Sequence, residues 1–209
     1  MRNPAVYLKP AVAAFLLWLT PGHPGLAQTQ PQNPPENHTQ EPSATAPDSA
    51  ADNTIATLLE RLRTAPAGEA ATLARTIELK WSASGSPTAD LLLKRGQDAL
   101  EASQLQRAIE HFTALTDHAP AFAEGWHGRA QAFFASGAYG LALSDLRTAL
   151  ALNPQHFGAI YGLAALLEQL EKPQEAHAAY KILLNLYPAH EKALEGVARL
   201  SPSVNGVAL

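Results

Sequence analysis

The chain has 209 residues, of which 46% are hydrophobic and 16% charged, and its formal net charge is −4 at pH 7. This acidic balance argues against nucleic-acid binding, which normally needs a basic surface. The sequence contains no cysteine, which excludes disulfides, thiolate metal sites and a cysteine nucleophile.

Residues 1–27 have the pattern of a secretory signal peptide. Arg2 and Lys9 give a positive start, and an uncharged apolar run follows at residues 11–19. The run is shorter than the ~20 residues that span a bilayer, and small residues follow it. We expect cleavage between Ala27 and Gln28, and hence a periplasmic or secreted chain with no stable membrane insertion. The alternative is an uncleaved N-terminal anchor.

Residues 28–53 are rich in Pro, Gln and Thr and contain no Val, Ile, Leu, Met, Phe, Trp or Tyr. Such a segment cannot bury enough apolar surface to offset the entropy lost on ordering. We therefore expect a disordered tether.

Residues 54–87 predict a helical hairpin. The first apolar stripe has the spacing i, i+3, i+4, i+7 and comprises Ile55, Leu58, Leu59 and Leu62. A second stripe runs from Leu73 to Trp81 and ends at a Ser-, Gly- and Pro-containing segment. The hairpin is interpreted either as an N-terminal cap packed on the unit that follows it, or as a degenerate repeat.

From residue 89 the sequence repeats every 34 residues. The series with this period include Pro120, Pro154 and Pro188; Ala108, Ala142 and Ala176; and Gly96, Ala130 and Ala164. Two antiparallel helices per unit explain these types, because small residues let two backbones approach and the proline ends the second helix. We expect Ala142 at a close helix contact, and an ion pair between Arg129 and Asp145 on facing helices.

The spacing and residue types resemble the tetratricopeptide repeat (TPR) family. The units would be residues 89–122, 123–156 and 157–190. Residues 191–200 resemble the extra helix that covers the end of such arrays, and residues 201–209 would form a flexible tail. The resemblance implies an all-α solenoid of about three helical hairpins with helical caps.

In the TPR family the first helices of successive units line a concave groove that holds a peptide or helix. Carried over to this chain, the groove candidates are Leu93, Gln97, Leu100, Glu124, His127, Gln131, Phe134, Tyr161 and Glu168. Exposed apolar residues among polar ones are typical of a recognition surface. The acidic or neutral side chains favour a basic or neutral ligand. We expect His127 to face solvent.

No chemistry beyond binding is expected. His111 and His118 would lie about 10 Å apart along one helix, too far to share a metal. The sequence has no GxSxG motif, P-loop or HExxH motif. We therefore expect no enzymatic activity, no metal and no cofactor.

The sequence favours an exported protein–protein interaction module, an adaptor or assembly factor in the bacterial cell envelope. Its partner would be another protein or a peptide, and no nucleic acid. The alternative is a self-associating structural subunit whose repeat faces form a homo-oligomer.

Overall fold

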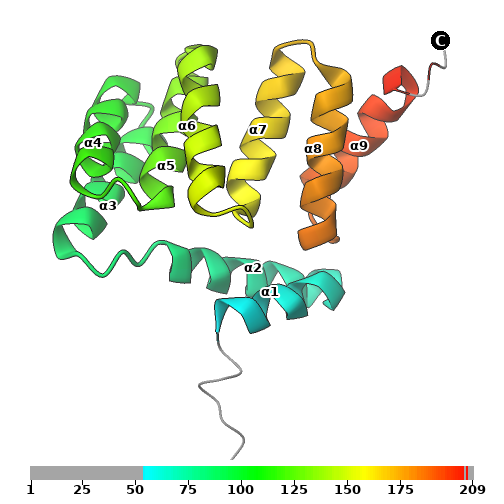
Figure 1. The fold of residues 1–209 in the computed structure, drawn as a ribbon, viewed down its shortest axis with the longest axis horizontal. Helices are drawn as coiled ribbons and strands as arrows, with labels where there is room; N and C mark the ends of the chain where they lie inside the picture. Colours follow the sequence, from blue (N-terminus) through cyan, green and yellow to red (C-terminus); the bar gives the residue numbers. More distant parts are fainter. Residues whose placement is uncertain (1–53, 205, 207–209) are drawn as a thin grey trace, which may run out of the picture. The chain divides into compact units, whose positions relative to one another are not determined.

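The computed structural model describes residues 54–204 and residue 206, so the predicted signal peptide and tether lie outside the described residues. The described part of the chain folds into nine α-helices (Figure 1). They are α1 (Ile55–Thr64), α2 (Ala67–Trp81), α3 (Pro87–Glu101), α4 (Leu105–His118), α5 (Ala123–Ala135), α6 (Tyr139–Leu152), α7 (Phe157–Gln169), α8 (Pro173–Leu186) and α9 (Glu191–Val204).

Helices α3 to α8 form three successive hairpins, which confirms the all-α TPR solenoid. The alanines of the repeat, Ala108, Ala142 and Ala176, are fully buried, as expected for positions where two helices approach closely. Gly96 lies at another such approach, because a Cβ there would come within 2.5 Å of the Phe112 ring.

The turn within each hairpin has the same backbone conformation. Ser103, Gly137 and Glu171, which are spaced by the repeat, all have positive φ angles, of 57°, 79° and 56°. At the middle turn the N–H of Gly137 donates to Phe134 O, and the N–H of Ala138 donates to Phe133 O. This pair of hydrogen bonds is the Schellman motif, which closes a helix through one left-handed residue.

Within the middle hairpin the predicted ion pair is confirmed. The Arg129 guanidinium donates to both carboxylate oxygens of Asp145, through Nε at 2.7 Å and Nη2 at 3.0 Å. Its Nη1 donates to Thr116 Oγ1 at 3.0 Å, and the guanidinium carbon lies 4.9 Å from the centre of the Trp126 ring. Arg129 thus connects α4, α5 and α6.

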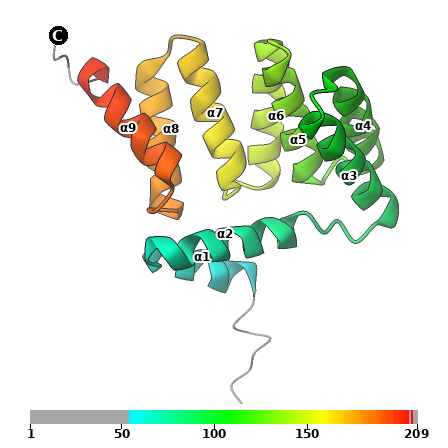
Figure 2. The same cartoon turned by 180° about the vertical axis from the view of Figure 1, so that it is seen from behind.

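The α1–α2 hairpin does not pack on the first repeat, so the predicted position of the cap was wrong. Leu62 and Ile77 share one apolar core with Phe157 and Tyr180, at the other end of the array. Figures 1 and 2 show α1 and α2 running crosswise to the helices of the repeats. The exposed face of α3 is mostly charged and polar, and it carries the Lys94–Asp98 ion pair.

The C-terminal helix extends beyond its predicted end. Helix α9 continues through Pro202 to Val204, so residues 201–204 belong to the helix and not to a flexible tail. Pro202 lies in the last turn, where its missing N–H removes a single backbone hydrogen bond. Ser201 Oγ donates to Val197 O in the same turn. None of the helices in the described residues is long and apolar enough to cross a membrane.

Candidate functional site

Three adjoining cavities lie along the inner faces of α5 and α7. Their volumes are about 540, 270 and 180 Å³, and all three are lined by His127, Gln131 and Gly158. The two larger cavities have Arg75 and Glu78 of α2 on their opposite side. We call this set of cavities the inner groove. Its position agrees with the groove predicted from the repeats, but α2 forms a wall that the repeat pattern does not predict.

The smallest cavity is the most apolar part of the inner groove. Phe134 of α5 and Tyr161 of α7 both line it, which confirms that these two aromatic residues face one surface. Leu146 and Gly162 lie at the same cavity. A Cβ on Gly162 would lie 3.3 Å from Leu146 Cδ2, a tight contact, so a larger residue there would crowd Leu146 at the cavity.

The other predicted groove residues differ in their surroundings. Gln97 is exposed and lines the 270 Å³ cavity, which Leu93 and Glu124 also line. Leu93 is only 4% exposed, so it is a core residue of the first repeat and not an exposed anchor. Leu100 packs against that same core and lines none of the three cavities. The sequence pattern placed both leucines on the binding surface, but Leu93 reaches the inner groove only as a buried core residue and Leu100 lies outside the three cavities.

Glu168 lies apart from the inner groove and connects three helices. Its Oε1 accepts hydrogen bonds from Tyr180 Oη at 2.6 Å and Arg199 Nη2 at 2.7 Å. Burial would raise the pKa of the Glu168 carboxyl, but these hydrogen bonds outweigh it and lower that pKa. The residue therefore fastens α7 to α8 and α9, a role that the groove pattern did not predict.

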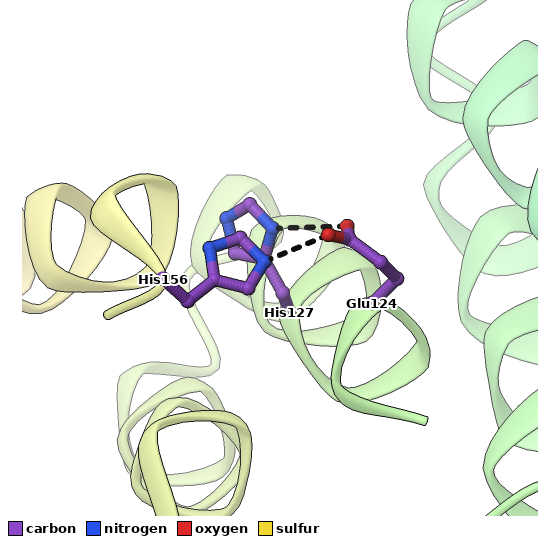
Figure 3. Close-up of side chains that lie close together, drawn as sticks. All are labelled: Glu124, His127 and His156. Carbon is purple, nitrogen blue, oxygen red and sulfur yellow. Dashed lines mark ion pairs between the residues drawn. The ribbon is translucent and has the colours of Figure 1, made fainter. Parts of the chain in front are cut away.

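Glu124, His127 and His156 form a buried cluster at the wall of the inner groove (Figure 3). Glu124 and His127 are one turn apart at the start of α5, and His156 precedes α7. His156 Nε2 lies 3.0 Å from Glu124 Oε1, and His127 Nδ1 lies 3.8 Å from Glu124 Oε2. The His127 side chain is 13% exposed, so the expectation that it faces solvent was wrong.

The protonation of this cluster follows from its burial and contacts. Burial would raise the pKa of the Glu124 carboxyl, but His127 and His156 lower it to about 2. Burial lowers the pKa of the His127 imidazole, which is therefore neutral at pH 7. The cluster thus has a fixed carboxylate beside an uncharged imidazole.

Arg75, Glu78 and His156 are site residues that the sequence analysis missed. His156 and His190 are one repeat apart, and each accepts a backbone N–H at the start of the following helix through its Nδ1 at 3.2 Å. This recurrence was a readable signal. Arg75 and Glu78 had no such signal, because their approach to the groove depends on where the hairpin packs.

Comparison with known proteins supports the resemblance to the tetratricopeptide repeat family. Family models described as tetratricopeptide repeat match residues 93–157 and 133–200. A TPR repeat-containing protein of Rhizobium etli is 33% identical over 138 residues, which cover 66% of this chain and 68% of that protein. Superkiller complex protein 3 of Mus musculus is 27% identical over 56% of this chain, a region that spans only 8% of its own length.

Solved structures show the same fold. The first TPR domain of Spaghetti (RPAP3), bound to an HSP90 peptide, superposes with a TM-score of 0.56 at 27% identity, over 57% of this chain and 95% of that one. MamA superposes with a TM-score of 0.54 at 21% identity, over 65% of this chain and 78% of that one. The 34-residue repeats, their packing and these matches together show that the chain belongs to the tetratricopeptide repeat family.

Proposed function

We propose that this chain is an exported protein–protein interaction module, an adaptor or assembly factor of the bacterial cell envelope, which binds a segment of another protein in the inner groove. The family supports the interaction role, since a related TPR domain at 27% identity holds a peptide. The signal-peptide pattern of residues 1–27 supports export. N-terminal sequencing of protein from a periplasmic fraction tests export, with Gln28 as the expected first residue. Recovery of an intact Met1 terminus from cytosol would contradict it.

One observation carries the proposal: the apolar cavity at Phe134 and Tyr161 adjoins larger cavities with polar walls. An apolar pocket accepts one side chain of a ligand, and the polar surface beside it can bind the backbone. Residues of α2 line the two larger cavities together with residues of α5 and α7, so a bound segment would contact the hairpin as well as the repeats.

Glu78 favours a basic group in the ligand, at a cavity that Arg75 and Lys192 also line. Glu78 projects from α2 at the two larger cavities and forms no side-chain ion pair with the described residues. Burial and the nearby Glu124 carboxylate raise the pKa of the Glu78 carboxyl. A lysine or arginine side chain of the bound segment would relieve this repulsion.

The test is capture of envelope proteins by the mature chain and by the Phe134→Ala, Tyr161→Ala double variant. Truncation of central aromatic residues typically costs ~2 kcal/mol or more of binding free energy, so capture should weaken at least tenfold. Leu141→Ala is the matched control, because Leu141 is 54% exposed on α6 and lies outside the cavities. Circular dichroism checks folding. Undiminished capture by the folded double variant would refute this site.

A second function, self-association, is favoured by the end of the array at α3. The hairpin packs at the other end and leaves α3 uncovered, with Leu91 48% exposed. Concentration-dependent mass on a sizing column, abolished by Leu91→Asp, would support a homo-oligomer. A constant monomer mass would exclude it.

A further inference from the structure

We propose that Glu124, His127 and His156 bind a divalent transition-metal ion, with zinc the best match. One ligand atom from each residue can be chosen so that all three lie within 4.8 Å of one another. Zinc is commonly held by imidazole nitrogens together with a carboxylate oxygen. Calcium and magnesium prefer all-oxygen sites, so two imidazoles disfavour them. The site differs from the His111–His118 pair that the sequence analysis considered for a metal, because it combines two residues at the start of α5 with the residue that precedes α7.

Charge is the first argument. The Glu124 side chain is 11% exposed, and the ion-pair contacts of its carboxylate are with the two imidazoles. A buried carboxylate is costly unless a cation compensates it. Arg129, the basic residue nearest to it along α5, is already bonded to Asp145. A divalent cation at the cluster would supply the missing positive charge.

An unpartnered nitrogen is the second argument. His156 is 3% exposed, and its Nε2 has no hydrogen-bond partner in the described part of the chain. Although Nε2 is only 3.0 Å from Glu124 Oε1, the contact lacks the direction of a hydrogen bond. Buried polar atoms are nearly always hydrogen-bonded, and an exception points to an ion or other ligand.

The histidine cap must change when the metal binds. Without metal, His156 Nδ1 accepts the N–H of Ala159 at 3.2 Å, so the proton of the neutral ring is on Nε2. Coordination through Nε2 places that proton on Nδ1 and removes the cap of α7. The loss of one cap hydrogen bond is small beside the free energy of a zinc site, so metal binding prevails.

The repeat itself does not require this cluster. His190 occupies the same position one unit later and caps α9 through the N–H of Ala193 at 3.2 Å. One repeat after Glu124 and His127 the chain has Gly158 and Tyr161, so His190 has no such carboxylate partner. A histidine at this position can therefore cap the following helix without a carboxylate and a second histidine beside it. Glu124 and His127 are not needed for the cap of α7.

The surroundings leave room to complete the coordination. The 270 Å³ cavity beside the three residues is also lined by Glu78, Gln97 and Gln131, so water or a further oxygen ligand can reach the ion. Trp81, the last residue of α2, stacks on His156 with ring centres 5.1 Å apart. A bound ion would thus fasten α5 to α7 beneath the end of the hairpin.

The experiment measures zinc binding to the metal-free mature chain by calorimetry and by the shift in melting temperature. We expect one zinc ion per chain and a raised melting temperature with ZnCl2 but not with MgCl2. His156→Asn removes Nε2 while asparagine still caps α7. This variant and Glu124→Gln should each weaken zinc binding at least tenfold, whereas His190→Asn, the matched cap control, should leave it unchanged.

Cobalt gives an independent readout, since Co²⁺ bound by nitrogen ligands at low coordination number has visible d–d bands. The bands should appear in the wild-type chain and disappear in His156→Asn. Absence of stoichiometric zinc binding by the folded wild-type chain would overturn the site. So would zinc binding of full strength in both Glu124→Gln and His156→Asn, which would assign the ion to other histidines.

Discussion

The ion pair between Arg129 and Asp145 should contribute far more than a surface pair. The two side chains are 15% and 6% exposed and share two hydrogen bonds of 2.7 and 3.0 Å. At ~4 Å and an effective dielectric constant of ~20, the attraction of two unit charges is about 4 kcal/mol. Removing one partner leaves a buried charge, at a cost of ~3–5 kcal/mol. The free energy of unfolding of a protein is typically only ~5–15 kcal/mol, so either single variant should lose a large part of its stability.

The two single variants should not lose the same amount of stability. Arg129→Met also removes the bond to Thr116 and the contact with the Trp126 ring, and it leaves the more deeply buried of the two charges. It should therefore cost more than Asp145→Ala. Asp145→Ala leaves an Arg129 that keeps its bond to Thr116.

The assay is urea unfolding of wild type, both single variants and the double variant, followed by circular dichroism. In the double variant no charge is left buried, so we expect it to be more stable than Arg129→Met alone. The coupling free energy of Arg129 and Asp145 should exceed the ~0–1 kcal/mol of exposed pairs. Zero coupling, or single variants as stable as wild type, would refute the reasoning.

Three more predictions concern packing and pH. Ala142→Leu should destabilise the chain by ~1–3 kcal/mol in urea unfolding, because Ala142 is fully buried at a helix contact. Gly128→Ala should lower the melting temperature, since its Cβ would come within 2.4 Å of the Phe112 ring, and adding Phe112→Leu should restore part of the loss. The pKa of Glu168 is lowered, because hydrogen bonds such as that from Arg199 outweigh the effect of burial. Glu168 therefore stabilises the fold at pH values above its unfolded pKa, and this contribution is lost as the pH falls. The stability difference between wild type and Arg199→Gln should therefore shrink below about pH 4.

The repeats could be predicted from sequence because their packing is local. The alanines of the period are fully buried in the cores of the repeats, so a spacing of 34 residues carries much of the packing pattern. The hairpin of residues 54–87 was also predictable, because its apolar stripes show that it has a face to bury. Where that face packs was not predictable, since Leu62 of α1 shares its core with Tyr180 of α8, which is more than half of the described chain away in sequence.

The candidate site shows the same limit. Glu124 and His127 were both identified, because they lie on the first helix of a repeat. His156 was missed because it lies in the connection between repeats, where the family pattern has no binding position. The burial of His127 depends on His156, which lies with its ring centre 4.5 Å away. An exposed His127 was thus the natural expectation from α5 alone, but His156, in the connection that precedes α7, covers it.

The packing of the hairpin decides how a partner can enter the inner groove. Leu58, Leu59, Leu62, Leu73 and Ile77 are each at most 5% exposed and belong to the core shared with the third repeat. Fully exposing one such side chain costs ~1.5–3 kcal/mol. If removal of the hairpin exposed half of that surface, the cost would be about 4–7.5 kcal/mol, which is half or more of the ~8 kcal/mol of a micromolar complex. A partner that had to displace the hairpin would therefore bind weakly. A segment that lies in the cavities beside this core leaves it intact, so the hairpin would act as a wall of the proposed binding site.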